Sequence, residues 1–149
     1  MTDHPEDAYF HELRGQILFE NGRIGEAVES YQRAVDLDPG EPLLRLGLAQ
    51  SQLETERPDQ VKPALAHLEE VVRREPRNSF AWRLLAIAYG RTDQIGMTAL
   101  ALGESALARG NAAEAKAQAD RAMHILPENS PAWIRAQDIK RAARRLEEG

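Results

Sequence analysis

Two seven-residue stretches of this sequence decide its fold: Pro76-Arg77-Asn78-Ser79-Phe80-Ala81-Trp82 and Pro127-Glu128-Asn129-Ser130-Pro131-Ala132-Trp133. Five of the seven positions are identical, and the stretches lie 51 residues apart. Another proline, Pro39, precedes the first stretch by 37 residues. The offset of 37 residues fits one unit of about 34 residues with a short insertion, and the offset of 51 residues fits one and a half such units. About 34 residues is the length of a helix–turn–helix repeat. The sequence therefore predicts a stack of helical hairpins.

The composition agrees with helices rather than sheets. Among 149 residues there are 23 alanines and only 8 aromatic residues, and alanine favours helices whereas aromatic residues favour strands. The predicted fold is all-α, a right-handed superhelix of antiparallel helical hairpins with about eight helices. The helices are expected at about 8–21, 24–37, 42–54, 60–74, 79–90, 95–109, 112–126 and 131–147.

The residues inside the units resemble the tetratricopeptide repeat (TPR). The first unit has small, aromatic and proline residues at the positions of that pattern, namely Gly15, Gly22, Ala27, Tyr31, Ala34 and Pro39. The TPR pattern is matched most closely by Trp82, Leu85, Ala86 and Tyr89. The first unit departs from the pattern at His11 and Arg14. The resemblance implies a single TPR-like domain over 1–149. Its parts would be repeats at about 8–41 and 42–78, a half-repeat at 79–95, a repeat at 96–129 and a capping helix at 130–149, the last helix having no partner.

Several small or polar residues have expected structural roles. Small residues should allow close helix packing at Gly15, Ala49, Ala86 and Gly103. Left-handed backbone is expected where helices stop, at Gly22, Gly90 and Gly110. Asp59 and Asn111 are expected to cap the helices that follow them. Pro63 fits only the first turn of its helix.

No residue pattern supports catalysis, a cofactor or a metal. There is no cysteine, and His11-Glu12 begins a zinc-protease motif whose second histidine is replaced by Gly15. The other histidines, His4, His67 and His124, have no partner at ligand spacing. The net charge of −5 argues against nucleic acid as a partner, and no apolar run approaches the ~18 residues that a membrane helix needs. We predict a non-enzymatic, protein-binding module.

The binding site is predicted from the groove-facing positions of the TPR family. These positions are Tyr9, Glu12, Gln16, Phe19, Leu43, Leu46, Gln50, Phe80, Arg83 and Ile87. Aromatic, aliphatic and a few polar groups would suit an extended, partly apolar protein segment. The alternative is that the apolar members are ordinary inter-helix core, and periodicity alone does not separate the two.

Two charged features bear on the partner. TPR domains that clamp a C-terminal carboxylate use Lys and Asn at positions that here hold Glu12, Gln16, Gly47, Phe80 and Leu84, so that use is not expected. The last helix carries a basic strip, Arg135, Lys140, Arg141, Arg144 and Arg145. The strip could meet an acidic partner or the acidic first half of another copy, but a solvated outer face is the preferred interpretation.

Three longer stretches resemble the C-terminal TPR domain of BepA-like bacterial periplasmic zinc metalloproteases. They run from Tyr9 to Gln16, from Trp82 to Arg91 and from Ala108 to Ile139, the last containing Ser130-Pro131-Ala132-Trp133. The resemblance implies the non-catalytic half of a protein of outer-membrane quality control. It would be periplasmic and would dock on the outer-membrane assembly machinery, on its substrates or on its own upstream protease domain. The alternative is a free-standing cytosolic TPR adaptor with an unrelated partner.

Overall fold

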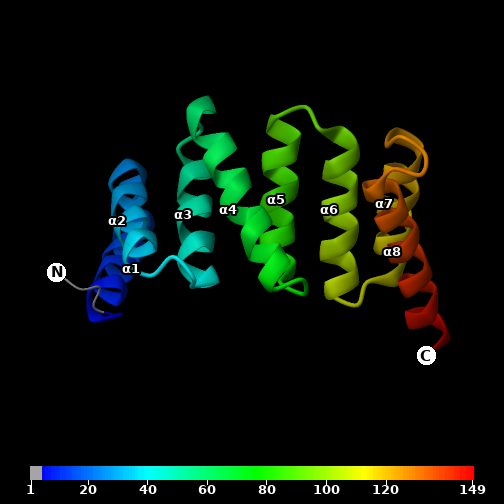
Figure 1. The fold of residues 1–149 in the computed structure, drawn as a ribbon, viewed down its shortest axis with the longest axis horizontal. Coiled ribbons are helices and arrows are strands. Elements are labelled where there is room, and N and C mark those ends of the chain that lie inside the picture. The colour runs from blue at the N-terminus through cyan, green and yellow to red at the C-terminus, as the bar shows by residue number, and fades with distance from the viewer. Residues whose placement is uncertain (1–4) are drawn as a thin grey trace. The chain divides into compact units, whose positions relative to one another are not determined.

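The computed structural model describes residues 5–149, and it is helical (Figure 1). This part of the chain contains eight α-helices, one 3₁₀ helix and no strand. The helices are α1 (Pro5–Glu20), α2 (Ile24–Leu37), α3 (Pro42–Glu54), η1 (Pro58–Gln60), α4 (Val61–Arg74), α5 (Ser79–Arg91), α6 (Ile95–Ala108), α7 (Ala112–Ile125) and α8 (Pro131–Glu148). The prediction of an all-α fold with eight helices is confirmed. No helix in the described part is both long and apolar enough to cross a membrane.

Helices α3, α5, α7 and α8 begin with a side-chain cap, whereas α2, α4 and α6 do not. Asn111 accepts a hydrogen bond from the Glu114 amide at 3.1 Å, as predicted. The prediction that Asp59 caps α4 is wrong. Asp59 lies inside η1 and pairs with Arg57, while α4 begins after Gln60, which makes no capping bond. Pro63 does lie in the first turn of α4.

Two of the three predicted left-handed glycines are correct. Gly22 and Gly110 have φ values of +78° and +76°. Gly90 has no such φ, because α5 continues through it to Arg91. The left-handed residue after α5 is Asp93, with a φ of +60°.

The chain divides into two compact units, the first ending at Glu75 and the second running from Pro76 to Gly149. In the first unit α1 packs on α2 and α2 on α3, and α3 pairs with α4. The buried cluster of this unit includes Ala8, Tyr31, Ala34, Val35, Leu44 and Leu48. Gly15 faces the Tyr31 ring across the α1–α2 contact, as predicted.

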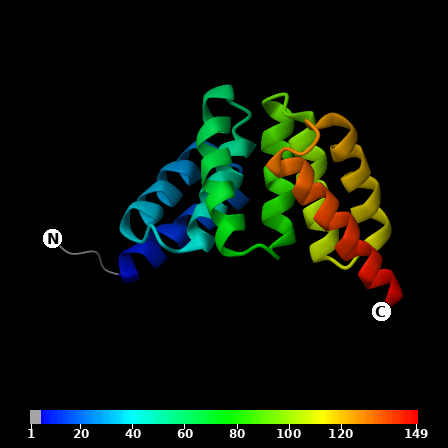
Figure 2. The same ribbon diagram turned by 45° about the vertical axis from the view of Figure 1, so that its right-hand side comes forward.

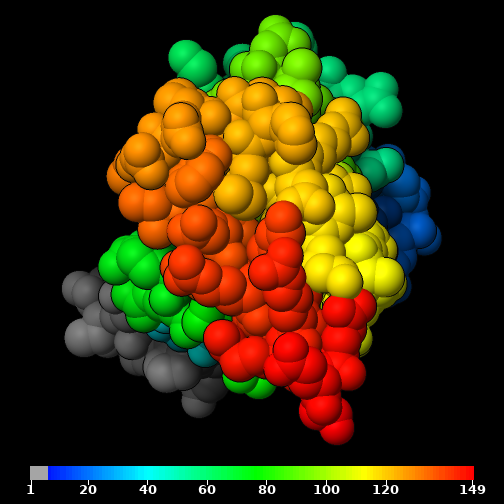
Figure 3. Space-filling view, turned by 90° about the vertical axis from the view of Figure 1, so that its right-hand side faces the viewer, coloured from blue at the N-terminus to red at the C-terminus, as the bar shows by residue number. Residues whose placement is uncertain are grey.

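In the second unit α6 is the central helix and packs against α5, α7 and α8. Its buried cluster comes from α6, α7 and α8 and consists of Ala99, Leu100, Ala106, Ala115, Ala119, Ala122, Ala136, Ile139 and Ala143. The prediction that the last helix has no partner is wrong. Helix α8 crosses α6 and α7 (Figures 2 and 3) and buries Ala136, Ile139 and Ala143 completely against them.

Candidate functional site

In the first unit, helix α1 supplies four of the predicted groove residues. Tyr9 is 65% exposed and Gln16 is exposed, whereas Glu12 and Phe19 are partly buried. Burial, with the nearby negative charge of Glu41, raises the pKa of the Glu12 carboxyl above its usual value. This face of α1 therefore offers an aromatic ring beside an amide and a carboxyl group.

Helix α3, which contacts α1, supplies three more predicted residues. Leu43 is 57% exposed, and Leu46 and Gln50 are partly buried. The first unit thus places seven of the ten predicted residues on two neighbouring helices.

In the second unit, helix α5 carries the other three predicted residues. Phe80, Arg83 and Ile87 share one face because they are three and four positions apart. The Arg83 guanidinium carbon lies 5.8 Å from the centre of the Phe80 ring, which is a cation–π distance. Ile87 is 43% exposed.

None of the six apolar groove candidates is fully buried. Tyr9, Leu43 and Ile87 are exposed, and the other three, Phe19, Leu46 and Phe80, are partly buried. Exposed apolar side chains that lie together on a surface are typical of interaction sites. The structure therefore leaves these residues accessible to a partner.

The apolar surface of α1 is wider than the predicted groove residues alone. Phe10, Leu13 and Ile17 are 57%, 42% and 52% exposed and lie beside Tyr9 on the helix. The sequence did indicate this wider surface, because apolar residues occur on both faces of this helix and only one face can pack on α2.

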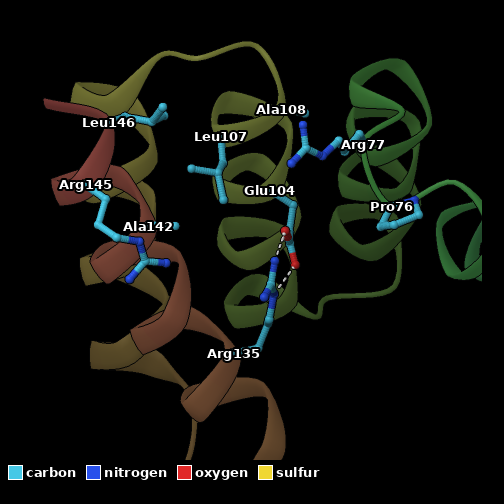
Figure 4. Close-up of a pocket in the computed structure, with 9 residues that line it drawn as sticks. All are labelled: Pro76, Arg77, Glu104, Leu107, Ala108, Arg135, Ala142, Arg145 and Leu146. Carbon is cyan, nitrogen blue, oxygen red and sulfur yellow. Dashed lines mark hydrogen bonds and ion pairs between the residues drawn. The ribbon is translucent and has the colours of Figure 1, made fainter. Parts of the chain in front are cut away.

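A pocket in the second unit was also missed (Figure 4). It encloses about 450 Å³ between α6, α8 and the chain before α5. Glu104 lies there with only 6% of its side chain exposed and binds Arg135 through two short bonds, of 2.6 and 2.7 Å. Hydrogen bonding to Glu104 raises the pKa of the Arg135 guanidinium. Arg77 and Arg145 also line this pocket.

The predicted basic strip of α8 is partly neutralised. Lys140 pairs with Asp120 at 2.7 Å, and Arg141 lies 4.0 Å from Asp138. With Arg135 bound to Glu104, three of the five basic side chains have an acidic neighbour. Among the described residues, Arg144 and Arg145 have none.

Of the three histidines in the described residues, His67 and His124 have polar neighbours, whereas the buried Nδ1 of His11 has no hydrogen-bond partner and its ring packs edge-on against Phe10. His67 Nδ1 lies 2.9 Å from an Arg45 nitrogen, and His124 Nδ1 lies 2.8 Å from the Asp120 carbonyl oxygen. His4 lies outside the described residues. Within the described residues, no three His, Cys, Asp or Glu side chains come together as a metal site would require.

Residues 1–101 match the family described as the cytochrome c-type biogenesis protein H TPR domain. This match covers about two thirds of the chain. The chain belongs to this family. It is therefore a TPR domain, a non-catalytic protein-interaction module.

Two curated relatives are similar to parts of this TPR domain. The peroxisomal targeting signal receptor of Eremothecium gossypii is 38% identical over 89 residues, which is 58% of this chain and 14% of the receptor. The small glutamine-rich tetratricopeptide repeat-containing protein 2 of Mycosarcoma maydis is 51% identical over 37 residues, 25% of this chain and 10% of that protein. The chain thus spans a small part of each relative.

Several solved structures share the fold. The first TPR domain of Spaghetti (RPAP3), solved with an HSP90 peptide, has a TM-score of 0.57 at 17% identity and covers 100% of this chain and 99% of that one. MamA of Desulfovibrio magneticus RS-1 has a TM-score of 0.64 at 21% identity, covering 98% and 77% of the two chains. A TPR protein of Thermus thermophilus has a TM-score of 0.52 at 22% identity, covering 95% and 81%.

Proposed function

We propose that this TPR domain binds an extended, partly apolar segment of another protein through the exposed faces of α1 and α3 in the first unit, and that the exposed face of α5 is a binding surface of the second unit. One observation carries the proposal: Tyr9, Leu43 and Ile87 are exposed at the groove positions of the TPR pattern. Burying such side chains in a complex is favourable by about 25 cal/mol per Å² of apolar surface. The polar groups Gln16, Gln50 and Arg83 lie on the same helices and would select among apolar segments.

The proposal is tested by selecting short random peptides on the intact protein. Replacing a central apolar contact typically weakens binding by about tenfold or more, so the variants Tyr9→Ala, Leu43→Ala and Ile87→Ala should lose that much affinity for selected peptides. Ile134→Ala is a matched control, because Ile134 is an isoleucine of similar exposure (45%) on α8. If the three variants bind as well as Ile134→Ala does, these positions are not the binding surface.

The biological setting has two leading candidates. The family match suggests a role in the biogenesis of c-type cytochromes. The three stretches similar to BepA-like proteases suggest instead a domain of a periplasmic protease that meets the outer-membrane assembly machinery. Because the family match spans 101 consecutive residues, we place cytochrome c biogenesis first and the protease second. A free-standing cytosolic adaptor is the third candidate.

Fractionation of source cells separates these settings. An antiserum against the domain should detect a periplasmic or membrane-associated protein under either of the first two, whereas a cytosolic band near 16.6 kDa would favour the adaptor. Deleting the gene then distinguishes the first two: loss of covalently bound haem in c-type cytochromes supports biogenesis, and accumulation of unassembled outer-membrane proteins supports the protease setting.

A further inference from the structure

The pocket of the second unit holds more positive charge than its own acid neutralises. Three arginines line it, Arg77, Arg135 and Arg145, against the single carboxylate of Glu104. The Glu104 carboxylate already accepts two hydrogen bonds from Arg135, from Nε at 2.6 Å and from Nη2 at 2.7 Å. In the described part of the chain, neither Arg77 nor Arg145 has an ion-pair partner. Figure 4 shows their side chains reaching into the space from opposite sides, Arg145 from α8 and Arg77 from the chain that precedes α5.

The Glu104–Arg135 pair makes this a built site rather than a patch of mobile surface charge. The carboxylate is nearly inaccessible and fixes the guanidinium in one orientation from the neighbouring helix. A guanidinium has five N–H groups, and the two bonds to Glu104 use only two of them. Arg135 is thus oriented in advance, with donors left for a ligand.

Apolar side chains line the same pocket. They are Pro76, Leu107, Ala108, Ala142 and Leu146, and Leu146 is 47% exposed. A volume of about 450 Å³ lies within the range of small ligand sites and accommodates a few side chains rather than a folded partner. The ligand therefore needs an anionic group and an apolar group close together.

We infer that this pocket binds an acidic side chain together with an adjacent apolar side chain of a partner protein. The acid is held by Arg77 and Arg145 beside Arg135, and the apolar group packs on Leu107 and Leu146. This inference rests on the proposed function as a protein-binding module and assigns it a second anchor point, on α6 and α8. All the pocket residues from Glu104 onward lie outside the segment that matches the family, residues 1–101.

Charge and dimensions favour a protein segment over other anions. A nucleic-acid site would need a wider basic surface to follow a phosphate backbone, and the whole chain carries −5. A free inorganic anion would make no use of the apolar lining. Acidic residues next to leucine or isoleucine in a partner use both parts of the pocket.

The test uses the same selection of random peptides on the full chain. We expect a class of selected peptides in which Glu or Asp adjoins a large apolar residue, and in these peptides changing the acid to its amide should weaken binding about tenfold. The variants Arg77→Glu and Arg145→Glu should cause a similar loss. Arg144→Glu is the matched control, because Arg144 directly precedes Arg145 on α8 and is exposed but does not line the pocket.

Each other outcome contradicts the inference. If no selected peptide depends on an acid, or if Arg144→Glu weakens binding as much as Arg145→Glu does, the pocket is not the anchor. If the chain alone forms larger species in sedimentation, and Arg145→Glu dissolves them, the occupant is a second copy and not a partner. Peptides that depend on Tyr9 and Ile87 but not on Arg77 and Arg145 would leave the proposed function standing and overturn this inference alone.

Discussion

At the scale of single residues, Tyr31 shows how the first unit is held together. Its ring, on α2, lies against two glycines of other helices. A Cβ at Gly15, on α1, would lie 2.8 Å from the nearest side-chain atoms of Tyr31, and a Cβ at Gly47, on α3, would lie closer still to that ring. One aromatic side chain therefore joins three helices only because two of them lack a Cβ there.

Gly47→Ala should consequently destabilise the protein. The added methyl overlaps the Tyr31 ring, and overpacking of this kind costs about 1–3 kcal/mol, against a gain of up to about 1 kcal/mol from helix propensity. Gly25→Ala is the control, since nothing lies within 4 Å of a Cβ at Gly25, and it should be neutral or slightly stabilising. Urea unfolding compares the two variants. Equal stability of both would show that the ring has room to move.

A second residue-scale prediction concerns His67. Burial and the positive charge of Arg45 lower the pKa of His67 below its usual value of 6.5, so the folded protein holds this histidine neutral, next to Arg45. Below about pH 6.5 the unfolded chain binds a proton at His67 that the folded chain does not. The free energy of unfolding therefore falls as the pH falls from 6.5 toward the lower pKa that His67 has in the folded protein.

The variant His67→Gln keeps a hydrogen-bond acceptor for Arg45 but does not titrate. Between about pH 7 and about pH 5.5, its free energy of unfolding should fall less than that of the wild-type chain. Urea unfolding at the two pH values gives the comparison, and titration of groups elsewhere cancels between the two proteins. An identical fall in both would mean that His67 is not responsible.

At the scale of elements, the sequence predicted where the helices lie but not how each begins. In the matching stretches at Pro76 and Pro127, the residue that caps the following helix is shifted by one position. In the first stretch, Asn78 caps α5 by accepting from the Ala81 amide at 3.0 Å. In the second, Ser130 caps α8 by accepting from the Trp133 amide at 3.3 Å. Pro131 explains the shift, because proline is favoured at the first helical position.

The two tryptophans differ accordingly. The Trp82 indole donates to the Pro76 carbonyl oxygen of its own loop, whereas the Trp133 indole donates to the Met123 carbonyl oxygen of the preceding helix. The same tryptophan position in the two stretches thus packs in two different ways. Sequence comparison alone gives no sign of this difference.

The shifted caps give a paired prediction. Asn78→Ala should cost about 1 kcal/mol of stability, as is usual for a lost N-cap, while Ser79→Ala should cost a few tenths at most. In the second stretch Ser130→Ala should cost about 1 kcal/mol. Asn129→Gly should be nearly neutral there, since Asn129 has a φ of +68°, which glycine adopts readily. Thermal or urea unfolding ranks the four variants. The opposite ranking in either stretch would contradict the assigned cap.

The contact between α6 and α8 could not be predicted from the sequence. Glu104 and Arg135 are 31 residues apart, and the 34-residue period says which helices exist but not which side chains of non-consecutive helices meet. The same holds for the pocket that this pair orients. By contrast, the groove candidates on α1, α3 and α5 follow from the resemblance to the TPR pattern, and their accessibility is what the structure adds.

The strength of this contact is measurable by a double-mutant cycle with Glu104→Gln and Arg135→Gln. Arg135→Gln alone leaves a buried carboxylate unpaired and should be the most destabilising, by roughly 1–3 kcal/mol. The double variant should recover part of that loss, giving a coupling energy of about 1 kcal/mol or more. A coupling energy near zero would show that Glu104 does not hold the Arg135 side chain in place.

At the scale of the whole molecule, the chain divides into two units at a point that the repeat pattern does not mark. The boundary between Glu75 and Pro76 falls in a loop of the same kind as the other loops between hairpins. Charge does change there: the first unit has 8 basic and 16 acidic side chains, and the second has 11 and 8. The first unit is thus acidic and the second mildly basic, so each unit by itself offers a surface of different charge to a partner.

This organisation predicts that residues 76–149 fold without the rest of the chain. Their core is contributed by α6, α7 and α8, and the Glu104–Arg135 and Lys140–Asp120 pairs are internal to them. Domains of about 55–65 residues already fold alone, so the isolated unit should be helical by circular dichroism and should unfold cooperatively in urea. It should also keep the acid-dependent, Arg145-dependent peptide binding, because every pocket residue lies within it. A fragment that stays unfolded while the full chain folds would show that the two units form a single cooperative domain, and the pocket would then have to be studied in the intact chain alone.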